Sequence, residues 1–150
     1  MLRVLKGPGC HIAAVLAATD FGLPGIEVID SRYRDFKFDL KSVIADNASA
    51  ACFAVDGRAV PAGCVDLRTL GVVLEKNGKV VLLGAGAAVL DHSAAAAVAM
   101  LANPLGPRGQ EIPAGTLILA GGVTEAVGVQ AGDHVDLRVQ ALGSVSVRFV

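Results

Sequence analysis

Residues 70–84, "LGVVLEKNGKVVLLG", contain two runs of β-branched and aliphatic residues on either side of Asn77-Gly78. Side chains of this kind favour β-strands. An Asn-Gly pair accepts positive φ at both central positions of a type I′ turn, which joins two antiparallel strands. The stretch therefore predicts a β-hairpin.

Two helices are predicted, one on each side of this hairpin. Residues 9–20 have apolar side chains on a 3.6-residue period and stop before a cluster of Gly and Pro, so they predict a short helix. Residues 91–106 are rich in alanine, which favours helix formation. Asp91 or Ser93 can cap the start of this second helix, and we expect Asn103-Pro104 to end it.

Strands make up most of the remaining prediction. Residues 42–51 are ambiguous between a helix and the end of a strand, with Asp46, Asn47 and Ser49 as cap or turn residues. Few of the predicted strands alternate cleanly between apolar and polar residues, so we expect most of them to be buried on both faces. Besides the hairpin, the strands are predicted at residues 25–30, 113–122, 134–139 and 144–150.

Composition limits the class of protein. A chain of 150 residues is one domain's worth, so residues 1–150 are taken as a single domain. Lys and Arg total 13 against 14 Asp and Glu, which gives no electrostatic reason to expect nucleic acid or an anionic membrane as a partner. The longest stretch of low polarity, residues 93–102, is too short to span a bilayer. Three cysteines without a CxxC pair indicate the cytoplasm.

Residues 25–38, "GIEVIDSRYRDFKF", are unusually charged for a chain that is 53% hydrophobic. Alternation along a strand at 25–30 places Glu27 on the opposite side from Asp30. Arg32 and Lys37 follow shortly afterwards. Taken alone, the stretch favours a charged, solvated strand edge over a binding site.

Residues 119–124, "LAGGVT", form a second candidate. An apolar stretch that ends in Gly121 and Gly122 allows backbone N–H groups to approach a ligand closely, and Thr124 adds a hydroxyl. A β-bulge explains the two glycines equally well.

Four blocks of sequence together resemble a known family. They are residues 16–38, 44–50, 117–133 and 142–150. In order, they are similar to the branch of the fumarylacetoacetate hydrolase superfamily that contains 2-keto-4-pentenoate hydratases and 4-oxalocrotonate decarboxylases. The resemblance runs from near residue 5 to residue 150, so it covers almost the whole chain.

The resemblance implies an α+β, mainly β fold: a mixed β-sandwich roll of the fumarylacetoacetate hydrolase C-terminal type with flanking helices, truncated at the N-terminus. It also implies a Mg²⁺ or Mn²⁺ ion that chelates a 2-oxo acid. Residues 24–30, "PGIEVID", match the family stretch that carries a metal-ligating glutamate, so Glu27 is the expected ligand. Hard cations prefer carboxylate oxygens, which suits this assignment.

The remaining residue roles follow from location beside Glu27 and are also expectations. Asp30, Arg32 and Lys37 are expected to orient ligands or substrate as catalytic residues. Gly121, Gly122 and Thr124 are expected to bind substrate oxygens.

The chain departs from the family pattern at its start. Family members also hold the ion with a Glu-x-Glu pair. Residues 2–5 of this chain, which lie at the approach to that position, are Leu, Arg, Val and Leu instead. Three interpretations follow: a fragment of a longer reading frame, a subunit completed by another chain, or a natural truncation that has lost the chemistry. We expect weak or no activity from these residues alone, and a homo-oligomer or a complex with a full-length relative.

The expected activity is that of a 2-keto-4-pentenoate hydratase, which adds water to a 2-oxo-alkenoate in aromatic meta-cleavage catabolism. Two alternatives remain open: a 4-oxalocrotonate decarboxylase of the same family, and a non-catalytic partner or assembly module. The expected small-molecule partner is a 2-oxo acid.

Overall fold

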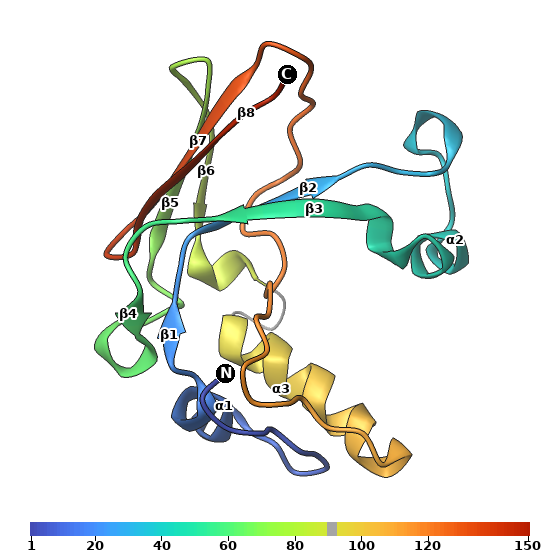
Figure 1. The fold of residues 1–150 in the computed structure, drawn as a ribbon, viewed down its shortest axis with the longest axis vertical. Helices are drawn as coiled ribbons and strands as arrows, with labels where there is room; N and C mark the ends of the chain where they lie inside the picture. The colour runs from blue at the N-terminus through green and yellow to red at the C-terminus, as the bar shows by residue number, and fades with distance from the viewer. Residues whose placement is uncertain (90–92) are drawn as a thin grey trace.

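The computed structural model describes residues 1–89 and 93–150, and their elements are β-strands with a smaller share of helix. Figure 1 shows the helices α1 and α3 at one end and a sheet at the other, with a two-stranded ribbon crossing between them toward α2. The helices and strands are α1 Ile12–Ala18, β1 Phe21–Gly22, β2 Gly25–Ile29, α2 Leu40–Ala45, β3 Ala50–Val55, β4 Val60–Pro61, β5 Gly71–Lys76, β6 Lys79–Ala85, α3 Ala94–Leu105, β7 His134–Val139 and β8 Gly143–Arg148.

The four-stranded antiparallel sheet has the order β6-β5-β7-β8. The predicted hairpin is confirmed as β5 and β6, with Asn77 at φ 53° and Gly78 at φ 75°, as a type I′ turn requires. The predicted strands at 134–139 and 144–150 are confirmed as β7 and β8.

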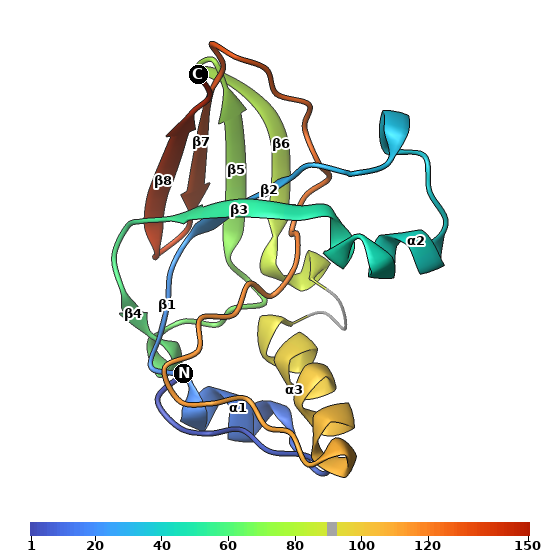
Figure 2. The ribbon, with the colours of Figure 1, turned by 45° about the vertical axis from the view of Figure 1, so that its right-hand side comes forward.

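Strands β2 and β3 form a separate antiparallel ribbon in which Glu27 is opposite Phe53. Figure 2 shows this ribbon passing across the four-stranded sheet. Ile26 and its partner Ala54 pack against a cluster made of Val72, Leu137 and Val145. The inner face of the ribbon is therefore fixed to the sheet by apolar contact.

A second core lies between α1 and α3. It contains Val15 and Ala18 of α1 and several buried alanines of α3, of which Ala102 has no exposed surface. The ends of the two helices are also joined by polar contacts: the Cys10 amide donates to Asn103 Oδ1 at 2.8 Å, and Asn103 Nδ2 donates to the Cys10 carbonyl at 2.9 Å.

The helix predicted at 91–106 is confirmed as α3, but it continues one residue past the predicted end at Asn103-Pro104, to Leu105. The packing of α3 on α1 and the Asn103 contacts outweigh the local preference against helix before proline. Ser93 is the N-cap residue, but its side chain makes no capping hydrogen bond with the described residues. Asp91 lies outside the described residues.

Two strand predictions are wrong. Residues 113–122 form no strand; they run along the surface after an isolated bridge between Leu5 and Ile112. A strand needs a neighbouring edge, and this segment pairs with none among the described residues. The strands are not buried on both faces either: none of the residues in β3 or β6 is fully buried. The ambiguous residues 42–51 contain the end of α2, a 3₁₀ turn at Asn47–Ser49 and the start of β3.

No helix in residues 1–89 and 93–150 is long and apolar enough to cross a membrane.

A buried carboxylate joins the hairpin turn to the strand β7. Asp133 lies within 2.8 Å of Lys76 Nζ and accepts from Asn77 Nδ2 and the Gln130 amide, each at 2.8 Å. The hydrogen bond from Lys76, then those from Asn77 and Gln130, lower the pKa of Asp133 to about 2. A carboxyl group with a lowered folded-state pKa stabilises the fold above its unfolded pKa of 3.8, and this contribution is lost as pH falls toward 2.

We therefore expect Asp133→Asn to lower the midpoint of urea unfolding at pH 7 and the difference from wild type to shrink between pH 4 and pH 2. Exposed Asp20→Asn is the matched control and should leave the midpoint unchanged. A difference that is constant from pH 7 to pH 2 would contradict the assignment.

The N-terminal segment passes very close to the end of α3. A Cβ added at Gly7 would overlap the backbone of Ala102 and Asn103. We expect Gly7→Ala to lower the free energy of unfolding by about 1–3 kcal/mol, the usual effect of overpacking. The control is Gly63→Ala, because a Cβ at Gly63 meets nothing within 4 Å. Equal stability of the two variants in urea unfolding would contradict this close approach.

Candidate functional site

Glu27 lies in the middle of β2 and points away from the core. Its neighbour Ile26 packs on the four-stranded sheet, and successive side chains of a strand point to opposite faces. The Glu27 carboxylate is accordingly exposed, on the outer face of the ribbon, with Phe53 of β3 directly opposite.

The segment that holds Gly121, Gly122 and Thr124 runs beside this ribbon. A Cβ at Gly25 would be 3.5 Å from Leu119 Cδ2, so the start of the segment touches β2. A Cβ at Gly84 would be 3.0 Å from Thr124 Cγ2, so the end of the segment touches β6. The structure thus brings residues 119–124 next to the strand that carries Glu27.

Gly121 has a conformational reason to be glycine. Its φ is 96°, a region that side chains with a Cβ rarely adopt. Both Gly121 and Gly122 are exposed, which leaves their backbone amides accessible to a ligand. Their role in binding substrate stays a prediction.

Asp30, Arg32 and Lys37 follow β2 in the arm, the name used here for residues 30–50, which includes α2. Arg32 is already shared among several acceptors: its Nε lies 2.9 Å from Asp46 Oδ1, and its Nη1 donates to the carbonyls of Asp30 and Ala50 at 3.2 and 3.4 Å. Through these contacts Arg32 holds together the two ends of the arm. These contacts use Nε and Nη1 of the guanidinium, so a substrate contact would fall to Nη2.

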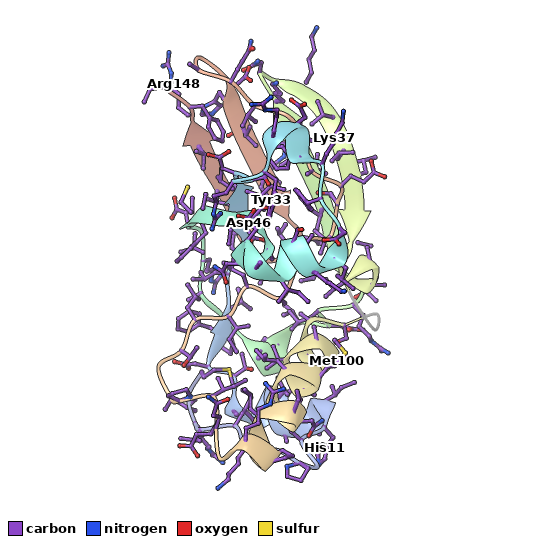
Figure 3. The ribbon with its side chains drawn as sticks, turned by 90° about the vertical axis from the view of Figure 1, so that its right-hand side faces the viewer. His11, Tyr33, Lys37, Asp46, Met100 and Arg148 are labelled. Carbon is purple, nitrogen blue, oxygen red and sulfur yellow. The ribbon has the colours of Figure 1, made fainter. Side chains whose placement is uncertain are left out.

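Lys37 lies further out. It follows the 3₁₀ turn Arg34–Phe36 and is exposed. In Figure 3, Lys37, Tyr33 and Asp46 occupy one part of the molecule, whereas His11 and Met100 lie at the opposite end. The site residues predicted from the sequence therefore fall into three groups: Glu27 on the ribbon, the glycine segment beside it, and the arm.

Asp46 is the residue that sequence reasoning missed. Its buried carboxylate Oδ2 accepts from Ser49 Oγ at 2.7 Å, from Ser31 Oγ at 3.3 Å and from the Arg32 amide at 3.4 Å. The Ser49 hydrogen bond, helped by the Arg32 amide and charge and by Ser31, lowers the pKa of Asp46. These contacts join the two ends of the arm.

The turn after Asp46 is strained. Asn47, Ala48 and Ser49 all have positive φ, at 53°, 54° and 58°. Consecutive left-handed conformations are unfavourable for residues other than glycine and persist where the surroundings impose them. The stretch "IADNASA" did indicate cap or turn chemistry at these residues, but it carried no signal for the contacts of Asp46 with Ser31 and Arg32.

The carboxylate of this region is the type of ligand that a hard divalent cation binds, but the region offers too few such ligands. Glu27 offers the carboxylate oxygens that Mg²⁺ prefers. Within the described parts of the chain, however, His, Cys, Asp and Glu side chains form no group of three that could hold a metal ion. Glu27 would need further donors from water, substrate or other polypeptide.

No protein-family model matches the chain. It is 62% identical over 146 residues to a 4-oxalocrotonate decarboxylase of Pseudomonas putida, a match that covers 97% of this chain and 55% of the relative. It is 38% identical over 145 residues to a 2-hydroxyhexa-2,4-dienoate hydratase of Comamonas testosteroni, covering 97% of this chain and 54% of the relative. A solved 4-oxalocrotonate decarboxylase from Pseudomonas putida G7, complexed with magnesium and adipate, superposes with a TM-score of 0.94 at 59% identity, over 99% of this chain and 56% of that chain.

The chain belongs to the fumarylacetoacetate hydrolase superfamily, in its hydratase and decarboxylase branch. The likeness to the solved structure confirms the predicted fold, and the branch predicted from the sequence is confirmed with it. The chain spans about 55% of the length of the Pseudomonas putida decarboxylase that it matches. A second solved structure of the Pseudomonas putida G7 enzyme, with calcium and acetate, has a TM-score of 0.91.

We expect Asp46→Asn to loosen the base of the arm. Loss of a buried, charge-assisted network should speed hydrogen exchange of the Asp30 and Arg32 amides on the order of tenfold. In the wild type, the exchange rates of these amides relative to their intrinsic rates should rise in the same way as pH falls through the lowered pKa of Asp46, because protonation removes the same charge.

The matched control is Asp39→Asn. Asp39 caps α2 by accepting from the Ser42 amide at 2.8 Å, within the same arm but outside the network. Its substitution should affect exchange in α2 and leave Asp30 and Arg32 unchanged. Equal exchange at Asp30 in the wild type and Asp46→Asn would contradict the bracing role.

Proposed function

We propose that this chain forms the Glu27 side of the active site of a metal-dependent lyase that acts on a 2-oxo acid, with decarboxylation of 4-oxalocrotonate as its reaction. The observation that carries the proposal is the 62% identity to the Pseudomonas putida decarboxylase over 97% of the chain. The magnesium and adipate with which the solved relative is complexed support a site for a cation and a carboxylic acid.

Hydration of a 2-oxo-alkenoate, the first expectation from the sequence, is the second candidate. It is supported by the 38% identical hydratase of Comamonas testosteroni and by a 34% identical 2-oxo-hept-4-ene-1,7-dioate hydratase of Escherichia coli. The higher identity to the decarboxylase is the reason to place decarboxylation first.

In this proposal Glu27 is the chain's ligand to a divalent cation. When bound, such a cation polarises the 2-oxo group and stabilises the negative charge that develops as carbon dioxide leaves or water adds. Glu27 stands opposite Phe53 of β3 in the register of the ribbon.

The other proposed site residues bind and orient. The amides of Gly121 and Gly122 donate to substrate oxygens, and Thr124 adds its hydroxyl. Lys37 donates to a carboxylate end of the substrate from the arm, and Asp30 orients the ligands of the cation. Arg32 takes part mainly by holding the arm through Asp46, from which its Nε is 2.9 Å away.

A catalytic site with Glu27 alone would hold Mg²⁺ weakly, because such sites usually need more than one anionic ligand or a substrate anion. We therefore infer that the 150 residues by themselves have weak or no activity, and that activity requires the further polypeptide that the relatives have.

The test compares the isolated chain with the chain fused to the part of the Pseudomonas putida relative that lies outside the match. Loss of 4-oxalocrotonate and of 2-hydroxypenta-2,4-dienoate is followed with added Mg²⁺. We expect turnover of 4-oxalocrotonate by the fusion only. In the fusion, Glu27→Gln should lower turnover at least about a hundredfold, since even residues that merely support a metal ligand contribute 10- to 100-fold.

Glu111→Gln, on the exposed surface beside Ile112, is the control and should keep full activity. Turnover by the isolated chain that Glu27→Gln abolishes would contradict the need for further polypeptide while supporting the ligand. A folded fusion that binds Mg²⁺ but turns over neither substrate would contradict the catalytic proposal and favour a binding or assembly role.

A further inference from the structure

Residues 117–127, the segment that carries the proposed substrate-binding amides, are held in place by packing. Within residues 1–89 and 93–150 they neither donate nor accept a hydrogen bond. The next hydrogen bond along the chain is accepted by the Gly128 carbonyl, from Lys76 Nζ at 2.8 Å. The positions of Gly121 and Gly122 therefore depend on the surfaces that this segment touches.

Gly84 of β6 is one of these surfaces. An added Cβ would lie 2.5 Å from the Val123 carbonyl oxygen and 3.0 Å from Thr124 Cγ2. Because Cβ atoms essentially never come within 3.0 Å of such a neighbour, the backbone of Val123 fills the space that any larger residue would need. The φ of Gly84 lies outside the left-handed region, so its own conformation would accept other residues. Gly84 is a glycine because of its neighbour.

A shift at Val123 would reach the residues on either side of it. The Val123 side chain packs against the apolar cluster beneath the ribbon, so this residue is held between that cluster and Gly84. The chain bends closely here, because a Cβ at Gly122 would lie 3.1 Å from the Thr124 carbonyl oxygen. Movement of Val123 is therefore passed to Gly122 and Thr124.

Lys76 of β5 holds the far end of the segment. Its Nζ lies 2.8 Å from the Gly128 carbonyl oxygen and 2.8 Å from Asp133 Oδ2. The Lys76 side chain is 25% exposed, and Asp133 is charged at neutral pH because its pKa is lowered to about 2. The ion pair thus keeps the ammonium group in place as a donor to the backbone shortly after Thr124.

The two contacts come from neighbouring strands of the four-stranded sheet, to which the ribbon with Glu27 is also fixed. The start of the segment touches this ribbon, since a Cβ at Gly25 would lie 3.5 Å from Leu119 Cδ2. One sheet therefore positions both sides of the candidate site, the strand of Glu27 and the segment with the two glycines.

We propose that Gly84 and Lys76 are positioning residues for the substrate: they place the amides of Gly121 and Gly122 beside the strand of Glu27 without contacting substrate themselves. The inference rests on the proposed function for the role of these amides and on the contacts above for their placement. Such placement matters because a displacement of about 1 Å can cost about a hundredfold in rate.

The test uses the fusion with the unmatched part of the Pseudomonas putida relative, 4-oxalocrotonate and Mg²⁺. We expect Gly84→Ala to raise KM for 4-oxalocrotonate at least about tenfold, because the amides that bind substrate oxygens are displaced. The dissociation constant of Mg²⁺, measured without substrate, should remain that of the wild type, since Glu27 lies on β2 and not on the displaced segment.

Gly71→Ala is the matched control. Gly71 begins the adjacent strand β5, its φ is not positive, and its Cβ would meet only the flexible end of Gln140, at 3.4 Å. We expect this variant to keep the KM of the wild type.

Lys76 provides a second, independent pair of variants. Lys76→Met removes the donor to Gly128 and should raise KM, whereas Lys76→Arg retains a donor and should restore most of the affinity. This pair decides alone if Gly84→Ala does not fold.

Two kinetic outcomes would overturn the proposal. One is a wild-type KM in both Gly84→Ala and Lys76→Met. The other is equal weakening of substrate and Mg²⁺ binding, which indicates general loosening of the fold.

A fusion that turns over neither substrate contradicts the proposed function, and the placement is then read without turnover. The amide resonances of Gly121 and Gly122 are followed in a ¹⁵N-glycine-labelled fusion and assigned by substitution of each glycine. Movement of both resonances in Gly84→Ala but not in Gly71→Ala would support the placement. Unchanged resonances in a folded Gly84→Ala would overturn it, so the two failures are distinguishable.

Discussion

The packing of the β2–β3 ribbon across the four-stranded sheet is the contact on which the rest of the arrangement depends. Ile26 and Ala54 provide the ribbon's side of this contact, and Val72, Leu137 and Val145 provide the sheet's side. Because strand side chains alternate, fixing Ile26 inward fixes Glu27 outward. A one-residue slip of β2 would bury the carboxylate in the core and place an isoleucine in the site.

The same contact explains how distant segments meet. Val123 belongs to the cluster beneath the ribbon, and this draws residues 119–124 alongside β2. The arm leaves from the far end of the ribbon and is closed by Asp46, which contacts Ser31 and Arg32 on one side and Ser49 on the other. A small apolar core and one buried carboxylate thus position all three groups of candidate site residues.

Features with local causes were predicted well from the sequence, and features with distant causes were not. The hairpin at Asn77-Gly78 is specified by its own turn residues and was found with its correct strands. The end of α3 was missed because Asn103 is held by Cys10, 93 positions away. The strand expected at 113–122 does not form, because strand pairing depends on a neighbouring edge that apolar composition does not reveal.

The candidate site residues follow the same rule. Asp46 looked like turn chemistry, since its partners Ser31 and Arg32 lie in a separate segment. Glu27 was singled out through family resemblance; charge and periodicity alone favoured a solvated edge.

The carboxylate of Asp133 has a consequence for how the sheet assembles. The hairpins β5–β6 and β7–β8 are each closed by a short connection, so each can form from neighbouring residues. Asn77 and Asp133, by contrast, are 56 positions apart, and α3 lies between them. Closing so long a loop is slow compared with forming a hairpin. We therefore expect the junction at Asp133 to form late in folding and to slow unfolding more than it speeds folding.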